Sequence, residues 1–184
     1  MEESVKNKEH EIMQNAEEHE VMQSTDNCVE KTYNQGTFHE LVEREFELPV
    51  MDISEYSILN LAFVGDNVFD LVVRTIVLTT GKRRVNDIHK LKSSLVKAET
   101  QAWIADYLLK ENLFTEEEAD YFRRGKNAKT QNHAKNAAIS EYHRATGLET
   151  VMGYLYLTNQ EKRIVELCKL GLDAYSEYSN AELF

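Results

Sequence analysis

The stretch NLAFVGDNVFDLVVRTIVL, residues 60–78, is the most apolar part of the chain and decides the fold that we expect. On a helix at about 100° per residue, its polar side chains fall within an arc of about 120°. They are Asn60, Asp66, Asn67, Asp70 and Arg74. This pattern predicts a central helix that is apolar over most of its surface and has one polar side facing a cleft or a partner.

Two aspartates in so apolar a helix need an explanation, because burying a carboxylate costs several kcal/mol unless a partner or a cation compensates it. A structural explanation pairs Asp70 with Arg74 at a spacing of four residues and gives Asp66 a hydrogen-bonding neighbour. A functional explanation makes one of the two acids a ligand for a cation. The pattern alone leaves both explanations open.

The rest of residues 54–178 has helical periodicity and no convincing alternation of period two, so we expect an all-α domain. The first long helix should stop at Gly81, and the motif TEEE, Thr115 to Glu118, is a capping box that should open a short helix. The expected helices span about 55–80, 87–111, 116–125, 136–145, 147–158 and 160–177, with Asn159 as the cap of the last.

Residues 1–50 differ from the rest in charge, with 13 Asp or Glu and 4 Lys or Arg, which leaves 19 acids and 17 bases for residues 51–184. Such a composition predicts a disordered acidic tail followed by one domain over residues 51–184. The repeat EHEIMQ and EHEVMQ places His10 and His19 among carboxylates, and a metal or partner site there is the alternative to a solvated arm. Cys28 and Cys168 are expected to be free thiols.

No stretch is apolar enough to span a bilayer, and the N-terminus has no signal-peptide pattern. We therefore expect a cytoplasmic protein without a membrane partner.

Four segments carry a family resemblance. AFVGDNVFDLVVR resembles the signature helix of the ribonuclease III family, in which an apolar run ends in Gly-Asp and continues apolar. Three more segments follow in the order and at the spacing of Mini-ribonuclease III, the compact branch without a double-stranded-RNA-binding domain. They are NDIHKLKSSLVKAETQA at 86–102, FRRGKNAK at 122–129 and LETVMGYLYL at 148–157. The resemblance covers about residues 54–176 and implies a helical ribonuclease III-like endonuclease domain.

The resemblance implies that Asp66 and Glu149 are the catalytic acids and hold Mg²⁺. Full-size ribonuclease III has three further acids, at positions where this chain has Leu59, Ala62 and Thr146. The reduced acid set resembles the Mini branch and leaves the number of metal ions open. From the residues alone, Glu149 has another interpretation, because TGLE at 146–149 also fits a capping box.

Binding of duplex RNA requires positive charge, which this chain gathers in residues 82–97 and 123–135. These segments suit the phosphates and 2′-hydroxyls of an A-form helix, whose deep major groove allows little base readout. Solvated side chains on helix faces are the alternative. The candidate RNA-binding residues are His89, Lys90, Arg124, Lys126, Asn127 and Lys129.

The leading functional hypothesis is a Mg²⁺-dependent endoribonuclease that cuts double-stranded RNA and leaves 5′-phosphate and 3′-hydroxyl ends. The resemblance further implies a homodimer and a role in maturing the ends of precursor 23S ribosomal RNA, with ribosomal proteins as possible partners. The main alternative is a catalytically weak RNA-binding ribosome-assembly factor of the same fold. An all-α nucleotide hydrolase is disfavoured, because the paired Glu-x-x-Glu helices typical of such enzymes are missing.

Overall fold

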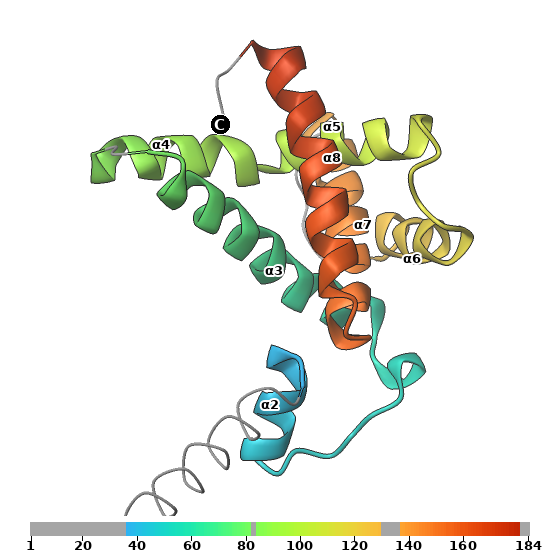
Figure 1. Ribbon diagram of the computed structural model, residues 1–184. Coiled ribbons are helices and arrows are strands. Elements are labelled where there is room, and N and C mark those ends of the chain that lie inside the picture. The colour runs from blue at the N-terminus through green and yellow to red at the C-terminus, as the bar shows by residue number, and fades with distance from the viewer. Residues whose placement is uncertain (1–35, 82–83, 130–136, 181–184) are drawn as a thin grey trace, which may run out of the picture. The chain divides into compact units, whose positions relative to one another are not determined.

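The computed structural model describes residues 36–81, 84–129 and 137–180, and every regular element in these ranges is a helix (Figure 1). The all-α prediction is therefore confirmed for the described part of the chain. None of its helices is both long and apolar enough to cross a bilayer.

The chain divides into two compact units, residues 1–42 and 43–184. The helix α2, Phe38–Glu45, runs across the division and was not assigned from the sequence. It begins with a capping box, in which the Glu40 amide donates to Thr37 Oγ1 and the Thr37 amide donates to the Glu40 carboxylate. The repeat with His10 and His19, Cys28 and the rest of residues 1–35 lie outside the described residues.

Helix α3, Ile58–Thr79, is the predicted apolar helix. It follows a short 3₁₀ helix, η1, Ile53–Glu55, and begins where the Ser57 side chain accepts a hydrogen bond from the Asn60 amide at 3.2 Å. Its end before Gly81 agrees with the prediction, since Gly81 has a positive φ of 139° that other residues rarely adopt.

The helix predicted over 87–111 is two helices, α4, Val85–Val96, and α5, Ala98–Lys110, so that prediction was wrong. Lys97 between them is extended, with φ −66° and ψ 149°. Side chains of α5 satisfy carbonyls that the break leaves free at the end of α4. Thr100 Oγ1 donates to the Ser94 carbonyl at 2.8 Å, and Gln101 Nε2 donates to the Val96 carbonyl at 3.1 Å.

Helix α6, Glu116–Lys126, begins at the predicted capping box, in which Thr115 and Glu118 each accept the other's backbone N–H. It continues past Gly125, the expected end, to a C-terminal cap at Asn127. Gly125 is buried inside the helix, where a Cβ would lie 2.2 Å from Thr150 Oγ1. A glycine that appeared to end a helix instead allows two helices to approach closely.

The expected break near residue 146 does not exist, because α7 runs without interruption over Ala137–Leu157. Thr146 Oγ1 donates to the Tyr142 carbonyl of its own helix at 3.0 Å and therefore caps nothing. Gly147 is buried against the Phe122 ring. The last helix, α8, Glu161–Ser179, has Gln160 and not Asn159 at its N-cap.

Helix α7 is the centre of the fold and is packed against α3, α5, α6 and α8. From Ala145 to Leu155 every side-chain position is buried except Glu149. A helix covered on all sides has no single apolar face, so its boundaries were hard to predict from periodicity.

Helices α3 and α7 cross with their backbones in contact at two glycines. A Cβ on Gly65 would lie 1.8 Å from the Glu149 carbonyl oxygen, and a Cβ on Gly153 would lie 2.0 Å from the Leu61 carbonyl oxygen. Neither carbonyl can move away alone, because each belongs to a helix backbone. Glycine is therefore required at both positions for this crossing.

Gly65→Ala should destabilise the protein by about 3 kcal/mol, the upper end for overpacking a core, because the added methyl meets backbone and not a flexible side chain. Urea unfolding followed by circular dichroism measures this loss. Thr79→Ala, at an exposed position of the same helix, is the control and should stay within about 0.5 kcal/mol of the wild type. A Gly65→Ala protein as stable as the control would show that the two helices can separate at no cost.

Candidate active site

The crossing of α3 and α7 brings the two predicted acids together. Gly65 lies against the Glu149 carbonyl, and Asp66 is the next residue on α3. Asp66 is exposed and Glu149 is half-buried, and they are close enough for the charge of Asp66 to act on Glu149. Two residues 83 positions apart in the sequence therefore form one acidic pair.

Burial raises the pKa of Glu149, and the charge of Asp66 raises it further, to about 7. A hydrogen bond from the Gln101 side chain acts in the opposite direction and lowers this pKa. Within the described ranges, neither Asp66 nor Glu149 forms an ion pair with a lysine or arginine. The pair is thus a site of uncompensated negative charge, which is the environment that a divalent cation stabilises.

The donor set fits Mg²⁺, which commonly takes one or two carboxylates and completes its shell with water and phosphate oxygens. No group of three or more His, Cys, Asp or Glu side chains able to hold a metal occurs in the described part of the chain. Of the positions where full-size ribonuclease III has further acids, Ala62 and Thr146 are buried. Asp66 and Glu149 would therefore be the protein ligands.

The alternative interpretation of Glu149 as a capping residue is wrong. Glu149 lies in the interior of α7, more than two turns after its first residue, and Thr146 is bonded to Tyr142 of the same helix. No helix begins at Thr146, so its backbone N–H needs no cap.

Asp70 has the structural role that the sequence allowed for it. Its carboxylate forms ion pairs with Arg74 of the same helix and with Lys92 of α4. Burial alone would raise the pKa of Asp70, but the hydrogen bonds and charges of Lys92 and Arg74 outweigh burial and hold it below its ordinary value. Lys92 is consequently used to join α4 to α3.

The end of α6 carries most of the candidate RNA-binding residues and reaches the same part of α7 as the acids. Gly125 packs against Thr146 and Thr150, on either side of Glu149 in the sequence. The flanking side chains are exposed: Arg124 and Lys126 in the last turn, the cap Asn127, and Lys129 just beyond it. The end of α6 thus packs on the part of α7 that carries Glu149.

Arg124 is partly engaged within α6. Its guanidinium lies 4.9 Å from the centre of the Tyr121 ring and 3.9 Å from the Asp120 carboxylate. Its exposed charge remains accessible to a phosphate.

His89 and Lys90 are exposed on α4, and no ion pair among the described residues joins them to Asp66 or Glu149. The structure therefore brings Asp66, Glu149 and the end of α6 together and leaves these two residues on a separate helix. Lys82, Arg83, His133 and Lys135 lie outside the described residues.

Residues 59–160 match the Ribonuclease III domain family, a range that contains both acids and the helices that hold them. The chain is 39% identical over 137 residues to Mini-ribonuclease 3 of Clostridium tetani, covering 74% of this chain and 89% of that protein. It is 38% identical to Mini-ribonuclease 3 of Enterococcus faecalis over 63% of this chain and 88% of that protein. A crystal structure of a Fusobacterium nucleatum protein superposes with a TM-score of 0.58 at 31% identity, covering 67% of this chain and 98% of that one.

The chain belongs to the ribonuclease III family. Within it, the chain is a member of the Mini-ribonuclease 3 branch, and the resemblance inferred from its motifs is confirmed. Membership makes it an endoribonuclease of the ribonuclease III type.

One residue of this ribonuclease III site was missed from the sequence. Gln101 is 1% exposed on α5 and lowers the pKa of Glu149, although its position is beside the predicted apolar face of that helix. The sequence signal for it was a glutamine in the otherwise mostly apolar run QAWIA, because a glutamine buried in such a run requires hydrogen-bond partners from neighbouring elements.

Glu149→Gln should change how the stability of the metal-free enzyme depends on pH. The unfolded chain ionises this residue near its ordinary pKa of 4.5, whereas the folded chain retains the proton up to about 7. Between these values the folded state binds more protons, so Glu149 makes the free energy of unfolding fall as the pH rises. The variant should lack this contribution, as measured by urea unfolding at several pH values across the interval.

The control for this measurement is Glu177→Gln, the same replacement at an exposed position near the end of α8. It should keep the wild-type dependence on pH. An identical pH profile for the Glu149→Gln and wild-type proteins would contradict the assigned environment of Glu149.

Proposed function

We propose that this chain is a Mg²⁺-dependent endonuclease that cuts double-stranded RNA at a site made by Asp66 and Glu149. The observation that carries the proposal is the convergence of these two carboxylates without a described cationic partner, at a buried helix crossing. Structural carboxylates in the same fold are compensated, as Asp70 is by Arg74 and Lys92.

The carboxylates of Asp66 and Glu149 would hold the metal, and Glu149 must lose its proton to do so. Bound Mg²⁺ would supply positive charge for activating a water and for neutralising the leaving 3′ oxygen. Hydrolysis of the bond between phosphorus and the 3′ oxygen would leave 5′-phosphate and 3′-hydroxyl ends. No protein nucleophile is needed for this hydrolysis.

The exposed residues at the end of α6 are proposed to contact the RNA backbone close to the cut. Arg124, Lys126 and Lys129 supply charge, and Asn127 supplies an amide for a phosphate or a 2′-hydroxyl. His89 and Lys90 on α4 would contact the duplex further from the acidic pair. The proposal extends to maturation of the ends of precursor 23S ribosomal RNA in the cytoplasm, with ribosomal proteins as further partners, as the resemblance to the Mini branch implies.

A homodimer is part of the proposal, because cutting both strands of a duplex needs two sites and one chain supplies one. The exposed side of α3 carries large apolar side chains among its polar ones, close to Asp66, and these suit a two-fold interface. Four of its large apolar side chains are exposed: Leu59 by 41%, Phe63 by 77%, Leu71 by 62% and Leu78 by 66%.

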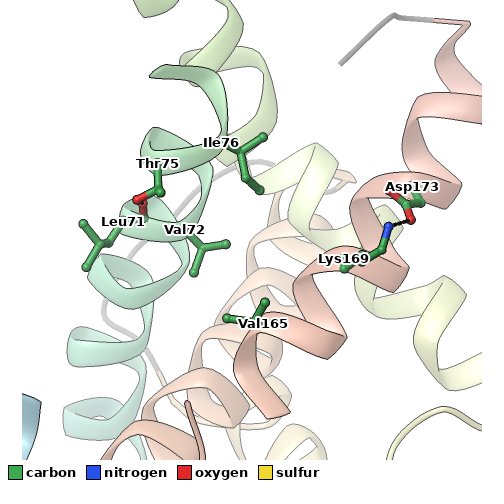
Figure 2. A pocket seen from close by; sticks show the side chains of 7 residues that line it. All are labelled: Leu71, Val72, Thr75, Ile76, Val165, Lys169 and Asp173. Carbon is green, nitrogen blue, oxygen red and sulfur yellow. Dashed lines mark hydrogen bonds and ion pairs between the residues drawn. The ribbon is translucent and has the colours of Figure 1, made fainter. Parts of the chain in front are cut away.

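A groove of about 580 Å³ lies between α3 and α8 (Figure 2). Its walls are Leu71, Val72, Thr75 and Ile76 from α3 and Val165, Lys169 and Asp173 from α8. The two charged residues pair with each other at 2.6 Å, so the groove presents mainly carbon to a partner. The exposed Phe63 and this groove are the apolar features of α3 that we propose a two-fold interface uses.

Asp66→Asn should abolish cleavage of a long RNA duplex in Mg²⁺, while duplex binding and the dimer persist, because the variant keeps the shape of the side chain and loses only its charge. Cleavage is measured by gel electrophoresis of end-labelled duplex, with a chelator as the metal-free reference.

Asp70→Asn is the matched control, one turn away on the same helix. It should retain most of the cleavage activity but lose about 1 to 3 kcal/mol of stability, because Lys92 and Arg74 lose a charged partner. Wild-type cleavage by a folded Asp66→Asn protein would instead favour the RNA-binding assembly factor without catalysis at this site.

Replacing Arg124, Lys126 and Lys129 together by Ala should weaken duplex binding and flatten its dependence on salt. Each lost phosphate contact removes about 0.9 from the slope of log K against log salt. Filter binding in Ca²⁺ at several salt concentrations measures the slope. Replacing Lys110 and Lys162, which are exposed on α5 and α8, should leave it unchanged, and a wild-type slope for the triple variant would place the end of α6 off the RNA path.

Phe63→Asp should dissociate the dimer, because it places a charge in the centre of the proposed apolar interface. Sedimentation velocity at micromolar protein measures the change from dimer to monomer. Val85→Asp, at an apolar residue of α4 that is 67% exposed, is the control and should remain dimeric. A dimeric Phe63→Asp protein would move the interface away from this face.

A further inference from the structure

Arg124 lies over the face of an aromatic ring near the end of α6. Its guanidinium carbon is 4.9 Å from the centre of the Tyr121 ring. The Tyr121 ring in turn stacks on Tyr154 of α7, with the ring centres 4.1 Å apart and the ring planes at 17° to each other. Because Tyr154 covers one face of Tyr121, the guanidinium occupies the other face. The three groups therefore form a stack that runs from the core to the surface.

The two rings give the Arg124 guanidinium a fixed support. Tyr121 is 8% exposed and Tyr154 is 6% exposed, so close packing holds both rings in place. Gly125, the next residue after Arg124, packs against Thr150 of α7 and fixes the helix backbone at this point. The Arg124 side chain itself is 44% exposed. An accessible positive charge thus rests on a buried aromatic base.

The contacts of Arg124 leave its N–H groups for another partner. Attraction between a cation and the face of a ring uses no hydrogen bond. The Asp120 carboxylate lies 3.9 Å from the Arg124 Nη1, which is beyond hydrogen-bond distance, and it accepts a hydrogen bond from Arg123 instead. A guanidinium has five N–H donors in a planar fork that matches two oxygens of a phosphate. Arg124 is therefore oriented by contacts that do not use up its donors.

We propose that Tyr121 is a positioning residue for RNA binding, whose ring holds the Arg124 guanidinium ready to bind a backbone phosphate through two N–H donors. This inference rests on the proposed contact between the end of α6 and the RNA. An unsupported arginine side chain loses its rotamer freedom when it binds, whereas an arginine already held on a ring has lost it beforehand. Tyr121 thus contributes to affinity without touching the RNA.

Charge and orientation make separable contributions to binding in this arrangement. The number of neutralised phosphates sets the slope of log K against log salt, whereas the ordering of a side chain changes affinity at every salt concentration. Removing the Tyr121 ring should therefore weaken binding and leave the slope unchanged. A general disturbance of the end of α6 would instead flatten the slope, because the proposed contacts of Lys126 and Lys129 would be lost as well.

The experiment measures filter binding of an RNA duplex in Ca²⁺ at several salt concentrations for Tyr121→Leu, Arg124→Ala and the double variant. Tyr121→Leu should raise the dissociation constant about 2- to 10-fold, the effect of ordering one free side chain, with the wild-type slope. Arg124→Ala should remove about 0.9 from the slope. Adding Tyr121→Leu to Arg124→Ala should change the dissociation constant by less than twofold, because no guanidinium remains to be positioned.

Two controls separate the effect of the ring from that of core packing. Tyr121→Phe keeps the ring and should bind the duplex within twofold of the wild type. Phe114→Leu removes a ring from the neighbouring stack of Phe114 on Phe122, whose centres are 5.9 Å apart and over which no cation lies in the described ranges. It should also bind within twofold of the wild type. Tyr121→Met takes the place of Tyr121→Leu if the latter does not fold.

Wild-type affinity in a folded Tyr121→Leu protein would overturn the inference. Additive losses in Tyr121→Leu and Arg124→Ala, a flattened slope in Tyr121→Leu, or an equal loss in Phe114→Leu would do the same. Wild-type affinity and slope in Arg124→Ala would instead refute the RNA contact of the proposed function at this residue, and the inference with it. The single variants therefore show which of the two proposals fails.

Discussion

The contact between Gly65 of α3 and the Glu149 carbonyl of α7 is the constraint on which the other features of the structure depend. With no side chain at Gly65, the two backbones approach closely enough for the following residue, Asp66, to lie beside Glu149. The second contact, of Gly153 with Leu61, fixes how the helices cross. The acidic pair is thus a consequence of helix packing, and a methyl group that separated the helices would also separate the acids.

The burial of α7 stabilises the fold and at the same time makes Glu149 an unfavourable place for a charge. Ten of the eleven positions from Ala145 to Leu155 are buried, and Glu149 is the exception. Low dielectric surroundings and the nearby Asp66 raise the pKa of Glu149 to about 7, so the metal-free protein is strained at neutral pH in its ionised form. A cation between the acids would remove this strain, which couples metal binding to stability.

Sequence reasoning succeeded where the determining interaction is local and failed where it is tertiary. The end of α3 at Gly81 and the capping box of Thr115 and Glu118 depend on neighbours in the chain, and both were predicted. The break at Lys97 depends on Thr100 and Gln101 reaching back to α4, and the continuity of α7 through Gly147 depends on Phe122 of another helix. Asp66 and Glu149 were found through the family motif, whereas Gln101 has no significance until α4, α5 and α7 are placed together.

The packing also explains why the site has so few acids. Full-size ribonuclease III has further carboxylates at two positions where this chain has Ala62 and Thr146. Ala62 is 6% exposed and Thr146 is 3% exposed. The Thr146 hydroxyl already donates to the Tyr142 carbonyl within α7. A carboxylate at either position would be buried beside Asp66 and Glu149 and would add to a repulsion that already raises the pKa of Glu149. Asp70 can be tolerated one turn from Asp66 only because Lys92 and Arg74 neutralise it. This helix crossing therefore accommodates two uncompensated carboxylates, and RNA phosphate and water would have to supply the remaining ligands of a bound Mg²⁺.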